Sequence, residues 1–221
     1  MNSDPVGAET LKIMATAKHY NYWLYQLIKP YLSGTIAEVG SGTGTFTQML
    51  EKDGYLVTTI DINPEYLSQE VLDLQMPNLP RRLFNKFDTI VALNVVEHIE
   101  QTDQVMNNFS SMLKKGGRLI ILVPQGKWAY GSLDQSLGHI TRYDQPELVN
   151  LISDAGFKIV STRSLNFVGV WGWWWNSRIV KRQLLPAWHV KLFDILAIPW
   201  LWLENLITLP MGLSLLAVAT K

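Results

Sequence analysis

Apolar runs alternate along the chain with stretches in which apolar residues recur every three or four positions. The runs FDTIVALNV (87–95) and RLIILVP (118–124) are nearly continuous, as in strands buried on both faces. Shorter strand candidates lie at 55–62, 71–74, 158–165 and 213–221, and the segment 35–44 reads as a short strand that runs into a glycine-rich turn. Helical stretches lie between them, at 17–32, 45–53, 102–114 and 146–157. This alternation predicts an α/β fold with an open, doubly wound, mainly parallel sheet of seven strands.

The chain of 221 residues is expected to form a single domain, residues 1–221. A helical segment rich in tyrosine and tryptophan precedes the first strand and predicts an N-terminal cap over about 9–33. Only 26 residues separate Asp61 from Asp88. We therefore expect the helix that usually joins these strands to be reduced to a turn at NPEYL (63–67).

Composition excludes several classes of protein. Lys plus Arg and Asp plus Glu each number 19, and the pI is about 6.9, so no basic field favours a nucleic-acid partner. Without cysteine there are no disulfides and no thiolate nucleophile. No signal-peptide pattern opens the chain, and the most apolar stretch, 192–203, is too short to span a bilayer. We expect a cytoplasmic protein, either free or lying against a membrane.

The first strand candidate runs into a glycine-rich turn with the sequence EVGSGTG (38–44). Glycines allow a sharp turn and close approach of a ligand, although a tight strand-to-helix turn without a ligand would use them too. Thr45 stands where the dinucleotide-binding motif G-x-G-x-x-G has its third glycine, which disfavours a nicotinamide or flavin cofactor. Glu38 suits a cationic, amino-acid-like ligand better than a pyrophosphate.

Polar side chains stand at or just after the ends of three further strand candidates. Asp61 ends the second, where a carboxylate can accept hydrogen bonds from both hydroxyls of a ribose. Asp73 follows the third, where it could accept the exocyclic amine of adenine, and Asn94 ends the fourth. Each alone is more often a surface residue or a cap. Together, at one edge of a sheet, they predict a nucleoside site.

Four ordered motifs, EVGSGTG, TIDI, FDTIVALNVVEHIE and LKKGGRLIILVP, resemble those of class I S-adenosylmethionine-dependent methyltransferases. The resemblance extends from about residue 17 to the C-terminus. It implies a Rossmann-like sheet with an antiparallel last strand, and S-adenosyl-L-methionine as the cofactor. The implied cofactor contacts are Tyr20, Glu38, Gly40, Gly42, Gly44, Asp61, Asp73, Leu74 and Asn94, with the glycines at the methionyl part and Asn94 near the sulfonium.

Two histidines are candidates for the base that takes a proton from the methyl acceptor. His98 follows the fourth strand, and His139 lies in the long connection 127–148. In methyltransferases that act on quinone precursors, pairs similar to Glu97-His98 border the acceptor pocket. Either histidine could instead order its own loop. Glu97 and His98 have no recognisable third partner in the sequence, so we predict no metal site.

Three further residues of this connection, Tyr130, Arg142 and Tyr143, are candidates for binding the acceptor. In relatives of this type a similar GH-x-x-RY segment closes over the active site. The alternative is that Arg142 and Tyr143 cap the helix that begins near Pro146.

A tryptophan-rich helical insertion over about 167–212 separates the last two strand candidates. Read as a helix, Trp171, Trp174 and Trp175 share one face. The stretch after Trp188 is apolar almost all round, and Pro199 should kink or split it. Three interpretations remain: a lid on the core or a homodimer interface, a wall for a hydrophobic acceptor, and peripheral contact with a membrane.

The sequence therefore predicts an S-adenosylmethionine-dependent methyltransferase that O-methylates a small hydrophobic or lipid-like acceptor. Methylation of nitrogen or carbon, or of a sugar or glycolipid, is the alternative within enzymes. An alternative of another class is a non-catalytic protein that binds the cofactor and acts through its tryptophan-rich insertion.

Overall fold

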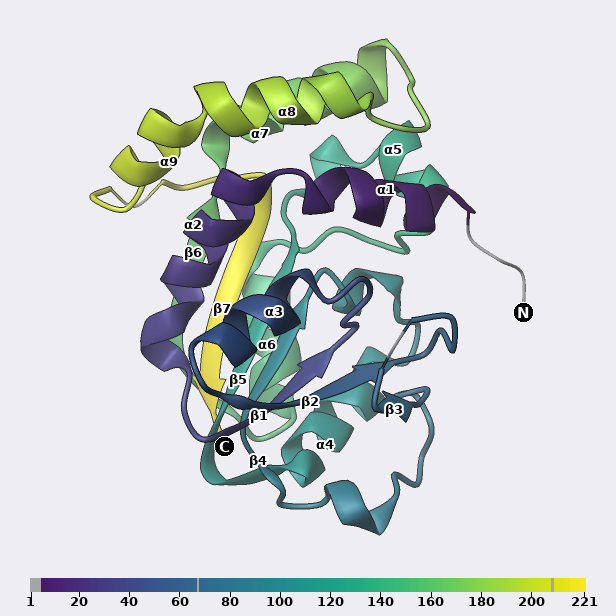
Figure 1. Ribbon diagram of the computed structural model, residues 1–221, viewed down its shortest axis with the longest axis vertical. Helices are drawn as coiled ribbons and strands as arrows, with labels where there is room; N and C mark the ends of the chain where they lie inside the picture. Colours follow the sequence, from purple (N-terminus) through teal and green to yellow (C-terminus); the bar gives the residue numbers. More distant parts are fainter. Residues whose placement is uncertain (1–4, 67, 208) are drawn as a thin grey trace.

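A sheet of seven strands forms the centre of the computed structural model, which describes residues 5–66, 68–207 and 209–221 (Figure 1). The strand order is β3-β2-β1-β4-β5-β7-β6, and β7 runs antiparallel to both of its neighbours. The bounds are β1 (Thr35–Val39), β2 (Leu56–Asp61), β3 (Glu70–Val71), β4 (Phe87–Leu93), β5 (Leu113–Pro124), β6 (Lys158–Leu165) and β7 (Ser214–Thr220). The fold class and the antiparallel last strand are confirmed.

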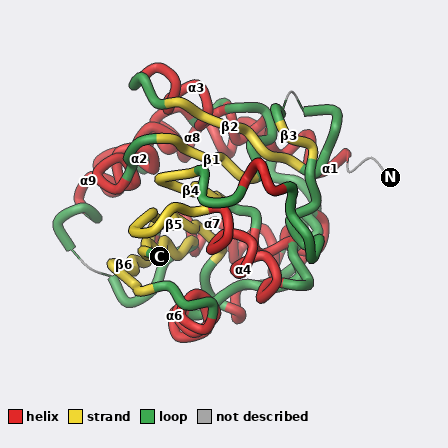
Figure 2. The backbone as a smooth tube through the Cα atoms, turned by 90° about the horizontal axis from the view of Figure 1, so that it is seen from below, coloured by secondary structure: helices red, strands yellow, loops and turns green. Residues whose placement is uncertain are grey.

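Helices cover both faces of this sheet (Figure 2). The longer ones are α1 (Pro5–Ala15), α2 (Lys18–Ile28), α3 (Thr45–Lys52), α4 (Thr102–Met112) and α6 (Gln145–Asp154), with the short α5 (Ser132–Ser136). Single 3-10 turns follow at Lys29–Tyr31, Arg81–Leu83, Val96–His98 and Lys127–Ala129. Helices α2 and α3 lie on one face, and α4 and α6 lie on the other.

The near-continuous apolar runs arise because neighbouring residues of a strand face opposite sides of the sheet. Ile90 of β4 and Ile121 of β5 point into the core shared with α4 and α6. Their neighbours Val91 and Ile120 point into the core shared with α2 and α3. All four are fully buried.

Several element boundaries differ from the expectation. The helical cap begins at Pro5 rather than near residue 9. Helix α4 ends at Met112 rather than at residue 114, because Leu113 already pairs with Phe87 in the sheet. The predicted turn is present at 63–66; Leu67, its last residue, is outside the described residues.

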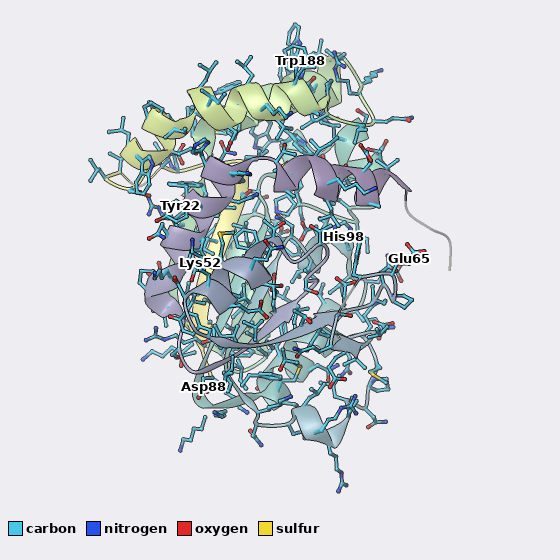
Figure 3. All side chains as sticks on the ribbon, viewed as in Figure 1. Tyr22, Lys52, Glu65, Asp88, His98 and Trp188 are labelled. Carbon is cyan, nitrogen blue, oxygen red and sulfur yellow. The ribbon has the colours of Figure 1, made fainter. Side chains whose placement is uncertain are left out.

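The insertion forms helices along the end of the molecule at which the parallel strands finish (Figure 1). Helix α7 (Phe167–Trp174) continues into a π-helical turn (Trp175–Ile179), followed by α8 (Ala187–Leu196) and α9 (Ile198–Leu203). The break between α8 and α9 at Ala197 confirms the split expected from Pro199. Figure 3 shows Trp188 of α8 at this end of the molecule, Asp88 near the other end, and His98 between them.

Two buried carboxylates hold the insertion in place. Asp194 of α8 accepts hydrogen bonds from the backbone N–H groups of His19 (3.3 Å) and Tyr20 (2.8 Å), in the first turn of α2. Glu204 accepts from the N–H groups at the start of α7, Asn166 (2.7 Å) and Phe167 (2.9 Å). The first N–H groups of a helix have no hydrogen-bond partner within that helix. Each of the two acids accepts from such groups in a helix distant in sequence.

Candidate active site

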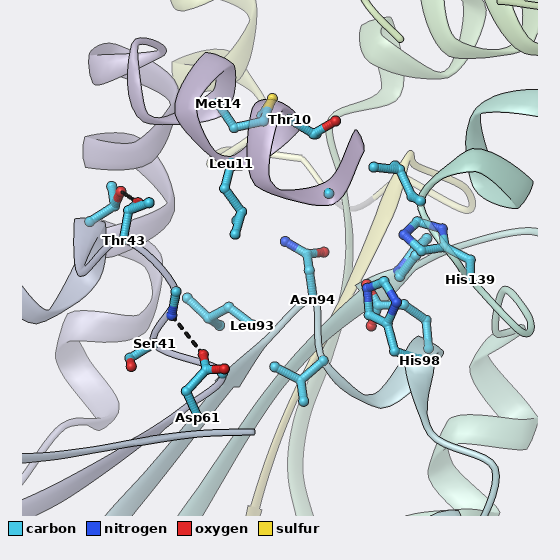
Figure 4. A pocket seen from close by; sticks show the side chains of 18 of the residues that line it. Thr10, Leu11, Met14, Ser41, Thr43, Asp61, Leu93, Asn94, His98 and His139 are labelled. Atoms are coloured by element: carbon cyan, nitrogen blue, oxygen red, sulfur yellow. Dashed lines mark hydrogen bonds between the residues drawn. The ribbon is translucent and has the colours of Figure 1, made fainter. Parts of the chain in front are cut away.

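A cavity of about 600 Å³ opens beyond the carboxyl ends of β1, β2 and β4 (Figure 4). This is the point where the winding of the sheet reverses, because β1 lies between β2 and β4. Ligands of open α/β sheets bind at such switch points. Residues of α1, including Leu11 and Met14, and residues of the insertion line the cavity as well.

The glycine loop adopts a backbone conformation that side chains disfavour. Gly40, Gly42 and Gly44 have φ angles of 65°, 49° and 75°, all in the left-handed region. A Cβ atom on Gly40 would lie 2.3 Å from Val95. Gly40 and Gly42 line the cavity, whereas Gly44 stands at the N-cap of α3. The loop can therefore bring its backbone close to a ligand at this helix terminus.

Asp61, the last residue of β2, binds the backbone of the glycine loop. Its Oδ2 accepts a hydrogen bond from the backbone N–H of Gly42 (2.9 Å, Figure 4), and its Oδ1 accepts from Asn63 N–H (2.9 Å). Each carboxylate oxygen can accept a further bond. A ribose with two neighbouring hydroxyls matches this remaining capacity.

Glu38 and Tyr20 form the inner wall beside the glycine loop. Glu38 is buried, accepts a hydrogen bond from the Thr47 hydroxyl and lines the cavity. Burial raises the pKa of its carboxyl group to about 7. The pKa of Tyr20, which is also buried, is raised mainly by desolvation. A cationic amino group bound here would stabilise the ionised form of Glu38.

The predicted adenine and sulfonium contacts also line the cavity. Leu74 is buried, whereas Asp73 is exposed and accepts from Gln75 N–H (2.9 Å). Asn94 has a left-handed backbone (φ 55°), and Figure 4 shows it between the glycine loop and the histidines. The cavity thus offers oxygen acceptors at one part and an apolar contact at another, which suits a nucleoside carrying an amino-acid chain.

His98 and His139 come together on the far side of Asn94 (Figure 4). Their ring centroids are 4.9 Å apart, at an angle of 77°. His139 Nδ1 lies 2.9 Å from Asp134 Oδ1, and His98 Nδ1 lies 3.3 Å from the Gly138 carbonyl oxygen. A carboxylate and a carbonyl only accept hydrogen bonds, so each Nδ1 carries the proton. In neutral rings, the lone pair is then on Nε2.

Asp134, which has no exposed surface, organises this side of the cavity. Besides His139 it accepts hydrogen bonds from Arg142 Nε (2.8 Å) and Trp173 Nε1 (3.2 Å). Burial alone would raise the pKa of Asp134, but His139 and Arg142 outweigh burial and lower it. Arg142 also lies 4.9 Å from the centroid of the Trp173 ring. One carboxylate thus orients three side chains that line the cavity, those of His139, Arg142 and Trp173.

The candidate bases and the residues of the connection 127–148 that were predicted to bind the methyl acceptor divide into two groups. His98, His139 and Arg142 line the cavity. The hydroxyl groups of Tyr130 and Tyr143 instead donate to the carbonyl oxygens of His139 (2.8 Å) and Val96 (3.4 Å), and neither residue is among those lining the cavity. Their contacts order the loops that carry the histidines.

The tryptophan face expected to bind the acceptor points away from the cavity. Trp171 and Trp175 are 57% and 56% exposed, Trp174 is half-buried, and none of the three lines the cavity. Trp173 lines it instead. The face that α7 and the following π-helical turn bury carries the small residues Gly169, Val170 and Ser177, whereas Trp171 and Trp175 lie on the exposed face.

Glu97 is the residue whose role the sequence left least defined. Its side chain is fully buried, and neither carboxylate oxygen has a hydrogen-bond partner among the described residues. Burial raises the pKa of this carboxyl group to about 8. The fold also supplies the third partner that sequence spacing did not reveal, because one donor atom each from Glu97, His98 and His139 lie within 4.8 Å of one another.

The fold and the cavity together define a Rossmann-like protein that binds a nucleoside cofactor beside a histidine pair. A family profile described as "Methyltransferase domain" matches residues 22–162. The chain belongs to this family, the class I S-adenosylmethionine-dependent methyltransferases. It is therefore an enzyme whose cofactor is S-adenosylmethionine.

Similar proteins agree with this assignment. A ubiquinone biosynthesis O-methyltransferase of Paramagnetospirillum magneticum is 27% identical over 101 residues, which are 41% of each chain. The match thus spans about two fifths of that curated relative. An Archaeoglobus fulgidus methyltransferase structure has a TM-score of 0.62 at 14% identity, covering 93% of this chain and 94% of its own. One from Mesorhizobium loti has a TM-score of 0.61 at 14% identity, covering 90% and 98%. These structures establish the fold.

Proposed function

We propose that the protein transfers the methyl group of S-adenosylmethionine to an oxygen atom of a small hydrophobic or lipid-like acceptor. The observation that carries this proposal is the pair His98 and His139, which lines the cavity beyond Asn94. Methyl transfer to oxygen requires the acceptor hydroxyl to lose its proton. The two imidazoles are the groups in position to promote that loss.

The cofactor is proposed to lie between the glycine loop and Asn94. Glu38 would accept hydrogen bonds from the amino group of its methionyl part, and Asp61 from the ribose hydroxyls. Leu74 would contact the adenine, with Asp73 near its exocyclic amine, and Tyr20 would border the amino-acid end. The buried Glu38 and the remaining acceptor capacity of Asp61 support this arrangement.

A hydrophobic acceptor suits the other part of the cavity. The residues that line it from α5 and the insertion are mostly apolar, namely Leu133, Leu137, Trp173, Leu184, Leu185 and Val190. Arg142 and Gln183 add polar groups to the lining. The curated relative from Paramagnetospirillum magneticum is named for O-methylation in ubiquinone biosynthesis, which agrees with an apolar, hydroxyl-bearing acceptor.

The outward face of the insertion supports contact with a membrane surface. Trp171, Trp175 and Trp188 are all more than half exposed. The two acids of the insertion, Asp194 and Glu204, are buried. Its remaining charged residues are all cationic, namely Arg178, Lys181, Arg182 and Lys191. Aromatic rings beside cations are typical of segments that lie in the headgroup region of an anionic bilayer.

No helix in the described part of the chain is long and apolar enough to cross a bilayer. The proposed contact is peripheral, through the outward tryptophan face of the insertion.

Calorimetry and a methyl-transfer assay test the proposed function. We expect S-adenosylhomocysteine to bind with one site per chain, and labelled methyl groups to appear on oxygen in a panel of lipid-soluble phenols. No binding of either cofactor form would refute the assignment. Binding without turnover across phenols, amines and glycolipids would favour the non-catalytic alternative, and methyl groups on nitrogen or sugar would correct the acceptor.

Flotation with vesicles tests the membrane contact separately. The wild-type protein should float with vesicles containing anionic lipid, and a variant with Trp171, Trp175 and Trp188 changed to serine should not. Replacing Trp23, which is buried in the core, would not be a suitable control, whereas exposed Trp128 lies outside the insertion. The Trp128→Ser variant should float like wild type. A wild-type protein that stays unbound and is dimeric would favour the homodimer interface.

A further inference from the structure

We infer that Asp134 is the positioning residue that makes His139, rather than His98, the base of the proposed methyl transfer. The inference rests on the proposed function and deepens it, because that function leaves both imidazoles as candidates. Asp134 belongs to the short helix α5 and is not among the described residues that line the cavity. It would therefore act through His139, which does line the cavity.

Four hydrogen-bond donors of the described chain surround the buried carboxylate of Asp134. Its Oδ1 accepts from His139 Nδ1 (2.9 Å) and from Arg142 Nε (2.8 Å). Its Oδ2 accepts from the backbone N–H of Gly131 (3.0 Å) and from Trp173 Nε1 (3.2 Å). A backbone N–H, a guanidinium and an indole can only donate, so they favour the ionised carboxylate. The proton of the shared bond is then on Nδ1 of His139.

The two imidazoles differ in the group that faces Nδ1. Nδ1 of His98 lies 3.3 Å from the Gly138 carbonyl oxygen, which carries no full charge, and His98 is exposed. The side chain of His139 is only 8% exposed, and its Nδ1 faces a carboxylate. A carboxylate in this position fixes the tautomer and stabilises the positive charge that an imidazole gains with a proton. His139 therefore has the support that a base needs, with Nε2 as the atom that takes the proton.

The charge balance of the reaction also favours His139. The proton of the acceptor hydroxyl moves to His139 Nε2, an electron pair of the oxygen forms the bond to the methyl carbon, and the pair of the broken carbon–sulfur bond stays on sulfur. The positive charge thus leaves the sulfonium and appears on His139, next to Asp134. The other polar and charged groups around His139 are Arg142 from the same connection, and Glu97 and His98 from the turn after β4. Arg142 offsets part of the charge of Asp134, but its Nη1 also donates elsewhere, to a backbone carbonyl oxygen.

Trp173 connects this pair of residues to the insertion. Its indole Nε1 donates to Asp134 from α7, and its ring lies 4.9 Å from the guanidinium carbon of Arg142. The insertion would thus help to hold the carboxylate in the orientation in which the other oxygen meets His139.

Turnover of the variant Asp134→Asn with two kinds of phenol tests the inference. An amide cannot accept along both edges, so it leaves buried donors unpaired or forces the other tautomer on His139. With a phenol that ionises at about pH 10, turnover at ~pH 8 should fall at least about 100-fold, while the affinity for S-adenosylhomocysteine in calorimetry is kept. With a dinitrophenol, which is already ionised, no proton has to be removed, and turnover should fall less than about threefold.

Two further variants separate the histidines. His139→Ala should show the same dependence on the ionisation of the phenol as Asp134→Asn. In His98→Ala, any loss of turnover should be equal for both phenols, because this ring would only contact the acceptor. A loss in His98→Ala that is confined to the un-ionised phenol would overturn the inference.

Asp194→Asn is the matched control. Asp194 is also buried, and its Oδ2 lies 2.9 Å from Nδ1 of His19, but neither residue lines the cavity. The ratio of the two turnover numbers in this variant should equal that of the wild type. An equal loss for both phenols in a cofactor-binding Asp134→Asn protein would give Asp134 a structural role only, and would overturn the inference.

Nitrogen-15 spectra of the histidines in the wild-type protein decide the point if Asp134→Asn does not fold. The signals of His139, assigned by their absence in His139→Ala, should show the proton on Nδ1 in the neutral ring. A proton on Nε2 would overturn the inference. A wild-type protein that methylates no oxygen would refute the proposed function, and the base with it, whereas O-methylation that is unchanged in Asp134→Asn would refute only the role of Asp134.

Discussion

Replacing Glu38 with glutamine should change how the stability of the protein depends on pH. Burial raises the pKa of Glu38 from 4.5 to about 7. Below pH 4.5 the carboxyl group is protonated in the folded and the unfolded chain, and it has no effect. As the pH rises to 7, the unfolded chain ionises while the folded one keeps its proton, so the free energy of unfolding falls. From the two pKa values, the loss between ~pH 5 and ~pH 8 is about 2.5 kcal/mol.

Glutamine keeps the shape of the side chain and an oxygen that can accept from Thr47, but it cannot ionise. Urea unfolding followed by tryptophan fluorescence, at ~pH 5 and ~pH 8, gives the difference in free energy of unfolding between variant and wild type. That difference should shift by about 2.5 kcal/mol in favour of the variant at the higher pH. Glu97 is present in both the variant and the wild type, so its contribution to the pH dependence cancels in the difference between their free energies of unfolding. Parallel pH profiles of variant and wild type would refute the reasoning. Saturating S-adenosylhomocysteine should shrink the shift, because its amino group would stabilise the ionised Glu38.

Three other substitutions give further predictions. Asp61→Asn should weaken S-adenosylhomocysteine binding by about 2 kcal/mol, or ~30-fold, in calorimetry, because charged acceptors make the stronger hydrogen bonds; an effect no larger than that of Asp73→Asn would contradict the ribose contact. His139→Ala should lower turnover by about 100-fold or more while cofactor affinity is kept, and unchanged turnover would remove His139 from the chemistry. Asp194→Ala should lower the free energy of unfolding by about 2 kcal/mol, since two N–H groups of α2 lose their acceptor; a change below about 0.5 kcal/mol in urea unfolding would show that water replaces it.

Much of the fold could be predicted because its signals are local. The runs that became β4 and β5 are apolar at every position, since both faces of the sheet are covered. The glycines at 40, 42 and 44 are required by the left-handed backbone there. Asp61 and Asn94 could be placed at one edge, because the ends of parallel strands meet.

The features that were missed depend on contacts between distant segments. Helix α4 ends two residues before the predicted position, because Lys114 and Lys115 suggest a last helical turn, whereas Leu113 already pairs with Phe87. His139, the third member of the cluster with Glu97 and His98, comes from another loop, and no spacing rule reveals it. A small clue did exist for Trp173, since Gly169 and Ser177 stand four residues on either side of it. Small residues repeated on one helical face indicate close packing, and this pattern favours an inward position for that face.

The pairing of β6 with β7 has an evolutionary consequence. Leu165 lies opposite Ser214 in the antiparallel ladder, so the two ends of the insertion emerge side by side from the sheet. A segment with adjacent ends can be shortened, lengthened or exchanged without moving the strands that carry it. The glycine loop and Asp61 belong to other strands and would be unaffected. Acceptor preference could therefore diversify by exchange of the insertion alone, while the glycine loop and Asp61, the proposed contacts of the methyl donor, stay the same.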